Sequence, residues 1–412
     1  MLNAEQRAIV KATVPLLESG GEALTTYFYQ HLLADHPEVR PLFNQAHQSS
    51  GAQPRALANA VLMYARHIDN LGPLGDMAGR IIQKHVALQI LPEHYPLVGA
   101  GLLQAIRDVL GAEIATDAVL AAWGAAYQQL ADLLMGAEAA IYDEKAAAPG
   151  GWRGARAFRV ARKVVESDEI TSFYLAAADG GALLAYRAGQ YIGVRLVVDG
   201  VEVRRNYSLS QQYSEQTSGA HYRISVKREP GGVASCYLHD QVQEGSTLEL
   251  FVPSGQFTLG DSGSSGSSGD SGSSGNGGKP VVLISGGVGI TPTLAMLQEA
   301  LASGRNVVFI HAARHGGVHA FRAEIDALAA RHRQLTVHYV YGQQQPGDGA
   351  VAAYGLLTPE LLAAWLPAQR DLDAYVLGPL GFMRFVRQTL RALGVPVAQT
   401  HHEFFGPASA LE

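Results

Sequence analysis

The chain has 412 residues, of which 47% are hydrophobic, so it is long enough to fill two to four separate cores. Its formal net charge is −6 at pH 7. This mild acidity gives no electrostatic reason to expect nucleic acid or an anionic membrane as a partner.

Cys236 is the single cysteine, which excludes an intrachain disulfide and a thiolate metal cluster and fits a reducing compartment. Residues 1–6 lack the basic and apolar regions of a signal peptide. No apolar run is long enough to span a bilayer. We therefore expect a soluble, cytoplasmic protein without an integral membrane segment.

Residues 1–145 are expected to form a compact all-α domain, because their apolar residues recur with helical period. Glycine or proline separates the predicted helices, with the first break at Gly20 and Gly21, and Thr116 is suited to cap the last helix. The predicted helices are Asn3–Glu18, Glu22–Leu33, Pro54–Asp69, Asp76–Ile90, Pro92–Leu110 and Asp117–Tyr142.

His85 lies inside an apolar stripe of one of these helices, on the same face as Ile81, Ile82 and Leu88. A neutral imidazole that faces an apolar pocket is suited to be the axial ligand of a haem iron. The plainer interpretation is a buried histidine that is hydrogen-bonded to a backbone carbonyl.

Tyr29 and Gln53 could both donate hydrogen bonds to a bound, partly negative dioxygen, and Phe43 lies between them in the sequence. Taken singly, a tyrosine of the core and a solvated glutamine at a helix start are equally compatible with the sequence.

The ordered set of these motifs resembles the globin domain of bacterial flavohaemoglobins. The set comprises His36-Pro37, which five residues separate from Phe43, then Gln53, Lys84-His85, Pro92, Tyr95 to Gly99, and Leu134 to Glu138. The resemblance implies that His85 is the proximal ligand of haem b, that Tyr29 and Gln53 line the distal pocket and that Phe43 packs on the haem.

The same resemblance implies that Tyr95 and Glu138 form a hydrogen-bonded set with His85. A carboxylate beside the other ring nitrogen gives the imidazole imidazolate character, which pushes electron density onto iron and favours O–O chemistry. Lys84, otherwise an ordinary surface lysine, would be turned toward a flavin.

Residues 152–259 are expected to form a small antiparallel β-barrel, because the hydrophobic period changes to two and turn signals separate short runs. The predicted strands include Phe158–Val160, Thr171–Leu175, Tyr191–Leu196, Tyr222–Val226 and Leu248–Val252.

Two patches of this segment are suited to a flavin dinucleotide. Arg205, Asn206, Tyr207 and Ser208 offer a cation, an aromatic face and a hydroxyl on one strand, and Gln190-Tyr191 is the second patch. Together with Gly232-Val233-Ala234-Ser235, they resemble the FAD domain of the ferredoxin-reductase family. The resemblance implies that Gly232 to Ser235 supply backbone amides to the FAD phosphates.

Residues 260–278 contain only glycine, serine, aspartate and one asparagine, a composition that cannot form a core. We expect a disordered linker that is longer than the connection in the related families. It should still permit the flanking domains to dock, because a longer loop costs little stability.

Residues 279–412 are expected to form an α/β domain with a parallel sheet. A buried strand at 280–285 is followed by the loop Gly286-Gly287-Val288-Gly289-Ile290-Thr291 and a helix, which is an arrangement that cradles phosphate. The loop is similar to that of NAD(P) domains in ferredoxin-reductase-like enzymes. Leu377 stands where the family usually has a cysteine beside the nicotinamide.

The C-terminal His402–Pro407 reads most simply as a short terminal strand. The resemblance implies instead that Glu403 lies near the flavin and tunes its potential. It also implies that the isoalloxazine ring is covered by Phe404, Phe405, Gly406 and Pro407.

The resemblance covers the chain apart from the linker, and it implies an NAD(P)H-dependent nitric oxide dioxygenase. NO and O2 would become nitrate at a haem that is re-reduced through FAD, which detoxifies NO under nitrosative stress. We expect a monomer, and a lipid could occupy the distal haem pocket.

Two other functions remain compatible with the residues. The chain could be an O2- or NO-binding or sensing globin with a maintenance reductase, or a flavin-dependent reductase for external acceptors.

Overall fold

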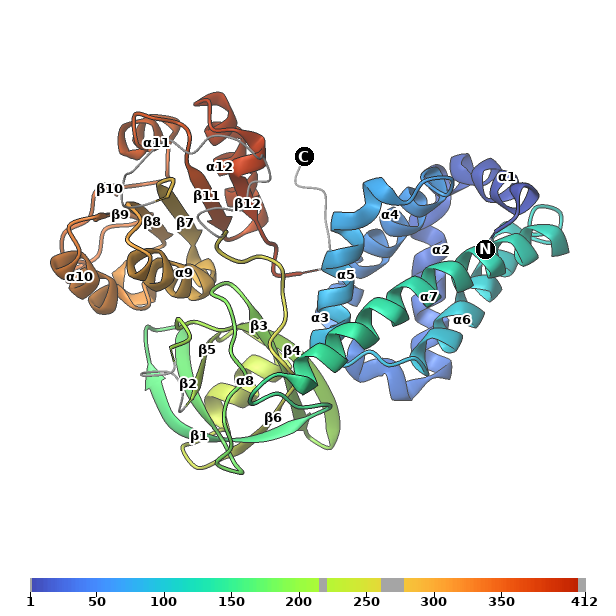
Figure 1. The fold of residues 1–412 in the computed structure, drawn as a ribbon, viewed down its shortest axis with the longest axis horizontal. Coiled ribbons are helices and arrows are strands. Elements are labelled where there is room, and N and C mark those ends of the chain that lie inside the picture. Colours follow the sequence, from blue (N-terminus) through green and yellow to red (C-terminus); the bar gives the residue numbers. More distant parts are fainter. Residues whose placement is uncertain (1, 215–220, 261–277, 407–412) are drawn as a thin grey trace. The chain divides into compact units, whose positions relative to one another are not determined.

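The computed structural model describes residues 2–214, 221–260 and 278–406 (Figure 1). These residues divide into two compact units. The first comprises the described residues up to 155 together with 193–206 and 405–406. The second comprises 156–192 and the described residues between 207 and 404.

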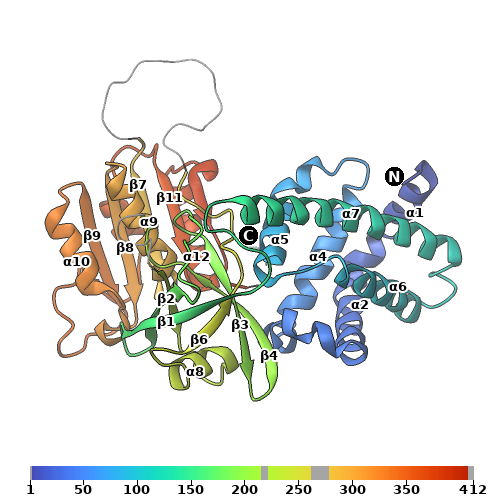
Figure 2. The ribbon, with the colours of Figure 1, turned by 60° about the horizontal axis from the view of Figure 1, so that its bottom comes forward.

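The first unit is built mainly from α-helices, as the sequence predicts. They are α1 (Ala4–Ala12), α2 (Val14–Asp35), α3 (Gln45–Ser49), α4 (Ala52–Arg66), α5 (Gly75–Leu88), α6 (His94–Leu110) and α7 (Asp117–Ala147), with 3-10 turns at Pro37–Leu42 and Gly72–Leu74. The long α7 runs along this unit in Figure 2. Its N-cap is Thr116, whose side chain accepts a hydrogen bond from the Val119 N–H.

The predicted helix break at Gly20 and Gly21 is wrong, because α2 continues through both glycines. The chain breaks earlier, at Thr13, and Pro15 lies in the first turn of α2, where proline is tolerated. Gly21 is buried, and a Cβ placed on it would lie 3.5 Å from that of Ala58 on α4. The glycine therefore permits close packing of α2 on α4 rather than ending the helix.

The middle of the chain forms the predicted antiparallel barrel. Its strands are β1 (Arg156–Val165), β2 (Ile170–Ala177), β3 (Tyr191–Val198), β4 (Val201–Ser208), β5 (Tyr222–Lys227) and β6 (Thr247–Leu250). They form a sheet in the order β4-β3-β6-β1-β2-β5. A bridge between Leu209 and Ile224 closes the curled sheet, because it joins the end of β4 to β5 at the opposite edge.

The C-terminal part is an α/β fold around a six-stranded sheet in the order β10-β9-β8-β7-β11-β12. All of its pairings in the described residues are parallel. The strands are β7 (Val281–Gly286), β8 (Val307–Ala313), β9 (Leu335–Tyr341), β10 (Ala353–Tyr354), β11 (Asp373–Leu377) and β12 (Thr400–His402). The helices are α9 (Ile290–Ala302), α10 (Arg322–Arg331), α11 (Pro359–Trp365) and α12 (Leu380–Ala392).

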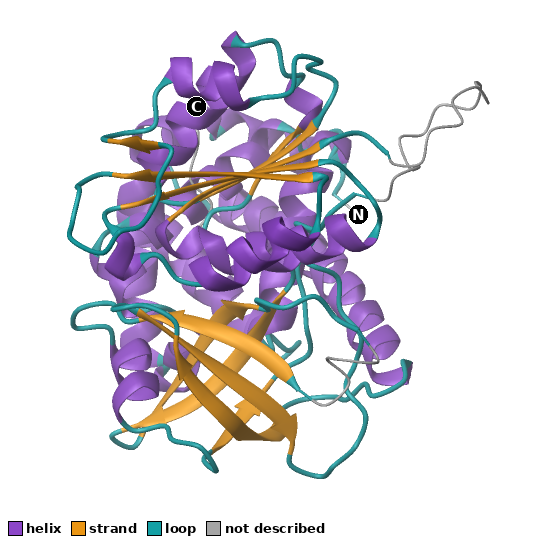
Figure 3. Cartoon of the chain, turned by 90° about the vertical axis from the view of Figure 1, so that its left-hand side faces the viewer, coloured by secondary structure: helices purple, strands orange, loops and turns teal. Residues whose placement is uncertain are grey.

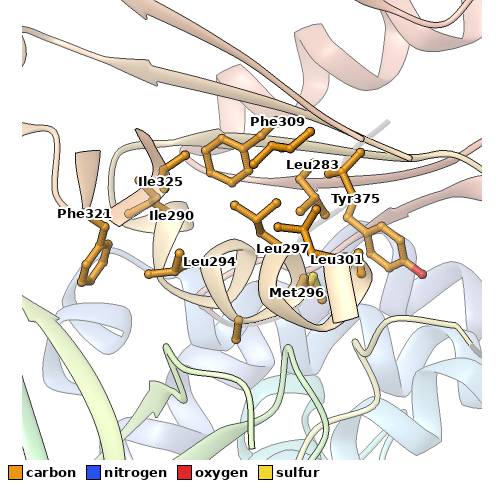
Figure 4. Close-up of a cluster of buried hydrophobic side chains, with 14 of the residues drawn as sticks. Leu283, Ile290, Leu294, Met296, Leu297, Leu301, Phe309, Phe321, Ile325 and Tyr375 are labelled. Atoms are coloured by element: carbon orange, nitrogen blue, oxygen red, sulfur yellow. The ribbon is translucent and has the colours of Figure 1, made fainter. Parts of the chain in front are cut away.

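Helix α9 is apolar on nearly all sides, with ten of its 13 residues buried. In Figure 3 helices lie between the parallel sheet and the barrel. The close-up in Figure 4 shows Leu297 of α9 packed beside Leu283 and Phe309 of the sheet. A helix that is buried on both sides needs such a composition.

The sequence prediction missed β10, α11 and a further helix, α8 (Val233–Asp240), that follows β5. Most of the predicted linker at 260–278 lies outside the described residues. Among the described residues, no helix is long and apolar enough to cross a membrane.

Candidate functional site

His85 lies one turn from the end of α5, beside a buried carboxylate. Its Nδ1 is 2.7 Å from Oε1 of Glu138 on α7 and 3.2 Å from the hydroxyl of Tyr95 on α6. The Tyr95 hydroxyl donates to the same Oε1 at 2.7 Å. Because an ionised carboxylate only accepts hydrogen bonds, Nδ1 carries the proton of the neutral ring. The lone pair of Nε2 therefore remains available for a metal.

The neighbours of His85 are buried tightly, with Glu138 2% and Tyr95 7% exposed. Burial and the hydrogen bond to Glu138 raise the pKa of Tyr95, so its hydroxyl stays protonated as a donor. Tyr127 donates to the backbone carbonyl of Tyr95 at 2.6 Å and holds the start of α6.

A second group of predicted residues meets between α2 and α4. The Gln53 Nε2 atom donates to the Tyr29 hydroxyl oxygen at 3.3 Å. The Phe43 ring meets the Tyr29 ring edge-on, with centroids 5.4 Å apart. Tyr29 is 5% exposed, and burial raises its pKa to about 12. The phenol therefore keeps its proton, and because its oxygen accepts from Gln53, its O–H remains free to donate.

These residues fit a haem. The donor set is an imidazole whose proximal partner is a carboxylate, which is typical of a haem tuned for O–O chemistry. No hydrogen bond or ring contact joins His85, Tyr95 and Glu138 directly to Tyr29, Gln53 and Phe43 in the described part of the chain. His85 of the first group would hold the haem, and Tyr29 and Gln53 of the second would supply hydrogen-bond donors.

The residues predicted to bind FAD are distributed over β4 and the start of α8. Arg205 is half-buried and donates to the Arg204 carbonyl at 2.7 Å. Tyr207 and Ser208 are half-buried, and Asn206 is exposed. Gly232 precedes α8, so the first-turn N–H groups of α8, those of Val233, Ala234 and Ser235, have no partner within the helix. The Arg205 guanidinium of the first unit and the first-turn amides of α8 in the second unit are each suited to a phosphate.

The side chains of Gln190 and Ser235 serve the loops around them. The Gln190 amide accepts from the Arg187 N–H and donates to the Gly255 carbonyl, both at 3.0 Å. The Ser235 hydroxyl accepts from the Glu229 N–H at 3.1 Å. Their side chains therefore fix backbone positions, and sequence reasoning alone assigned them only to direct cofactor contact.

The predicted C-terminal residues lie in different surroundings. Burial and the Glu403 carboxylate raise the pKa of Tyr191, which places Glu403 in electrostatic reach of that phenol. Phe404 packs against the core around β11 and α12, whereas Phe405 is 42% exposed. The Lys84 ammonium donates to the Gly406 carbonyl at 2.6 Å. Pro407 lies outside the described residues.

The glycine loop after β7 is shaped by close backbone approaches. A Cβ on Gly289 would lie 2.5 Å from the carbonyl oxygen of Leu377, and one on Gly286 would lie 3.3 Å from the Phe382 ring. Gly287 is exposed with φ +55°, and the Thr291 hydroxyl donates to the Val288 carbonyl at 3.0 Å. Ile290 begins α9 and is fully buried. The strand, loop and helix therefore follow one another as predicted, and this arrangement is suited to a phosphate.

Three family models match the chain. The Globin model matches residues 26–134, the Oxidoreductase FAD-binding domain model residues 157–259 and the Oxidoreductase NAD-binding domain model residues 283–388. A flavohemoprotein of Burkholderia sp. strain TH2 is 65% identical over 412 residues, covering 100% of both chains. The chain belongs to the flavohemoprotein family. A Pseudomonas aeruginosa flavohemoprotein is 61% identical over the same coverage.

Solved structures agree with membership of the flavohemoprotein family. A Malassezia yamatoensis flavohemoglobin, determined with bound FAD and heme, covers 98% of this chain and all of its own, with 26% identity and a TM-score of 0.83. The FAD/NAD binding domain of a Vibrio cholerae nitric oxide dioxygenase covers 62% of this chain and all of its own, with 36% identity and a TM-score of 0.53.

Two residues of this flavohemoprotein that sequence reasoning missed hold the end of the helix that carries His85. The Tyr142 hydroxyl donates to the Ile90 carbonyl at 2.8 Å, and an Arg204 N–H donates to the Leu88 carbonyl at 2.6 Å. Arg204 therefore satisfies a carbonyl that α5 leaves without a partner at its C-terminus, and Tyr142 fixes the chain just beyond that end. No sequence signal joins residues so far apart in the chain.

Proposed function

We propose that this flavohemoprotein is an NAD(P)H-dependent nitric oxide dioxygenase, which converts NO and O2 to nitrate. The proposal rests on the 2.7 Å contact between Nδ1 of the half-buried His85 and the buried Glu138 carboxylate. This contact lies in a globin fold that shares its chain with FAD- and NAD-binding modules. The Vibrio cholerae nitric oxide dioxygenase, whose reductase module is 36% identical, supports the assignment.

His85 would hold the iron of haem b through Nε2, and FAD and NAD(P)H would bind the two following modules. When bound, the haem supplies the iron at which NO and O2 react, and FAD passes on singly the two electrons that NAD(P)H delivers as hydride.

On the proximal side, Glu138 orients the imidazole and increases its electron donation through the Nδ1 hydrogen bond. Tyr95 holds Glu138 from a second direction. Gln53 fixes the orientation of the protonated Tyr29 phenol, which would donate a hydrogen bond to dioxygen bound in the distal pocket.

In the reductase part, Arg205 and the first turn of α8 would bind the FAD pyrophosphate, while Tyr207 and Ser208 would contact the flavin ring. Lys84 and Glu403 would place charge near the flavin, and Phe404 to Pro407 would cover it. The cradle from Gly286 to Thr291 would bind the NAD(P)H phosphates at the start of α9.

We also propose that the chain divides functionally at 1–145, 152–259, 260–278 and 279–412, and that it acts as a cytoplasmic monomer. A single cysteine fits a reducing compartment. A lipid in the distal pocket would be held by half-buried apolar side chains such as Leu57 and Val61 of α4.

A His85→Ala variant separates this function from the two alternatives. It is expected to lose NO consumption while it keeps NADH-driven reduction of an artificial dye, because dye reduction needs only the flavin. His31→Ala, on the exposed face of α2, is the matched control and should keep both. Equal loss of dye reduction in the His85 variant would refute the division of roles.

A further inference from the structure

A cavity of about 560 Å³ lies in the second unit, between the barrel and the helices α9 and α10. Its volume is within the range of small-molecule sites. Its described lining comprises Arg162, Tyr174, Gln211, Gln212, His221, Arg223, Gln298, Leu301, Ala302, Glu324, Leu328 and His332. None of these residues belongs to the Arg205–Ser208 strand, the start of α8 or the glycine loop. The cavity is therefore separate from the proposed FAD and NAD(P) sites.

Arg223 is a buried cation in the wall of this cavity. It is 4% exposed, and its Nη1 is 3.1 Å from Oε2 of Glu324. Its Nε atom has no hydrogen-bond partner among the described residues. Glu324 is the sole carboxylate among the described lining residues, and its other oxygen accepts from Gln298 at 2.8 Å. The one lining carboxylate is therefore already bound on both oxygens.

Arg162 contributes a second positive charge, and this charge has no carboxylate within ion-pair distance in the described residues. Its guanidinium carbon lies 3.9 Å from the centroid of the Tyr174 ring, which holds the group by stacking. Glu166 is in electrostatic reach of both arginines but does not line the cavity, and burial raises its pKa.

The remaining lining offers both polar and apolar contacts. Gln298 also accepts from the Gln212 N–H at 2.8 Å, which ties the loop after β4 to α9. Leu301, Ala302 and Leu328 form an apolar portion. Burial and the two arginines lower the pKa of His221, which therefore contributes a neutral ring.

We propose that this cavity binds a small organic anion, with its carboxylate or phosphate group at Arg162 and Arg223 and its apolar body against Leu301, Ala302 and Leu328. The guanidinium fork of Arg162 is suited to both oxyanions. Arg223 adds its Nε–H group, which has no partner among the described residues, because its terminal nitrogens already donate to Glu324 and to the Ser210 carbonyl. These two donors and the apolar portion together select an organic anion over a neutral or cationic ligand.

Calorimetric titration of the cofactor-loaded full chain, with excess NAD+ present to fill the nucleotide site, tests this proposal. Benzoate, phenyl phosphate and benzyl alcohol share one ring and differ in the head group, so they distinguish a carboxylate, a phosphate and a neutral ligand. At least one anion should bind with a dissociation constant on the order of 1 mM or tighter, and the alcohol should not.

Arg162→Gln should weaken that binding about tenfold or more. The control is Arg159→Gln, which changes an exposed arginine of the same strand outside the cavity lining and should leave the binding unchanged. Ala302→Trp fills the cavity from its exposed edge and should also abolish binding without touching either charge. Absence of binding by both anions would overturn the proposal. Binding that survives Arg162→Gln and Ala302→Trp, or equal binding of the alcohol, would overturn it as well.

Discussion

Tyr29 and Glu138 are buried polar residues whose hydrogen bonds decide what each can do next. The Tyr29 oxygen accepts from Gln53, so the phenol proton is left to donate. The Glu138 Oε1 atom accepts from both Tyr95 and His85, so the imidazole is fixed with its Nε2 available. The Tyr29–Gln53 pair presents a hydrogen-bond donor, and the His85–Glu138 pair presents a nitrogen ligand for iron. A site that binds and activates dioxygen requires both.

Replacing Tyr29 with phenylalanine removes the donor and keeps the ring. We expect O2 to dissociate about tenfold faster, because one hydrogen bond to a partly charged acceptor is lost. Stopped-flow measurement of O2 dissociation from the ferrous protein tests this. Tyr27→Phe is the matched control, since the Tyr27 hydroxyl bonds Asp108 on the protein surface. An unchanged dissociation rate in the Tyr29 variant would remove Tyr29 from the distal site.

Replacing Glu138 with glutamine keeps the shape and removes the negative charge. Turnover should fall about 10- to 100-fold, and the iron–histidine stretching frequency should decrease because the imidazole donates less charge. Glu144→Gln, an exposed change on the same helix, should alter neither quantity. A wild-type stretching frequency in the Glu138 variant would show that the carboxylate does not tune His85.

At the scale of elements, the sequence pattern predicts what depends on local period and misses what depends on packing. The pattern identifies α5, α7 and the buried strand β7. It fails at Gly20 and Gly21, where contact of α2 with α4 outweighs the low helix propensity of glycine. The prediction misses α11 because a helix of seven residues is too short to show a clear hydrophobic period. Tyr142 and Arg204 act across tertiary distances that no local pattern records.

The approach of the glycine loop to β11 gives a prediction for this element. Gly289→Ala would place a Cβ 2.5 Å from the Leu377 carbonyl oxygen, and relief of this clash should cost about 1–3 kcal/mol. The Michaelis constant for NADH should rise in a dye-reduction assay. Gly381→Ala on α12, where a Cβ meets nothing within 4 Å, should behave as wild type. Normal NADH kinetics for Gly289→Ala would contradict the proposed cradle.

Two buried histidines near the ends of β7 and β8 predict a pH dependence of stability. The His311 ring bonds the Ser285 hydroxyl at 2.8 Å and lies 4.5 Å from the His319 ring. Burial lowers the pKa of His311 to about 3 and, together with His311 and Arg322, that of His319 to about 2. Below about pH 6.5, the unfolded chain binds protons that the folded chain excludes.

Stability should therefore be fully present above about pH 6.5 and decrease on acidification by about 1.4 kcal/mol per pH unit for each histidine. Urea unfolding followed by circular dichroism between pH 7.5 and 5.5 measures this slope. His319→Gln should reduce this slope, because it removes one of the two groups whose pKa burial lowers. An identical slope in wild type and His319→Gln would contradict the assignment.

At the scale of the whole molecule, the order of the three modules matches the chemistry of electron transfer. A nicotinamide delivers two electrons as hydride and a haem iron accepts one at a time, so a flavin is required between them. The flavohemoprotein relatives match the full length of the chain. One departure is Leu377, which is fully buried at the end of β11 and replaces the cysteine that the resemblance implies.

The measurement that tests the central proposal most directly is NO consumption at an electrode, in air, with NADH and the purified protein loaded with haem and FAD, followed by assay of nitrate. We expect rapid, cyanide-sensitive loss of NO with one nitrate formed for each NO consumed. If NO is not consumed although haem and FAD are both bound, or if the product is not nitrate, the dioxygenase assignment is wrong.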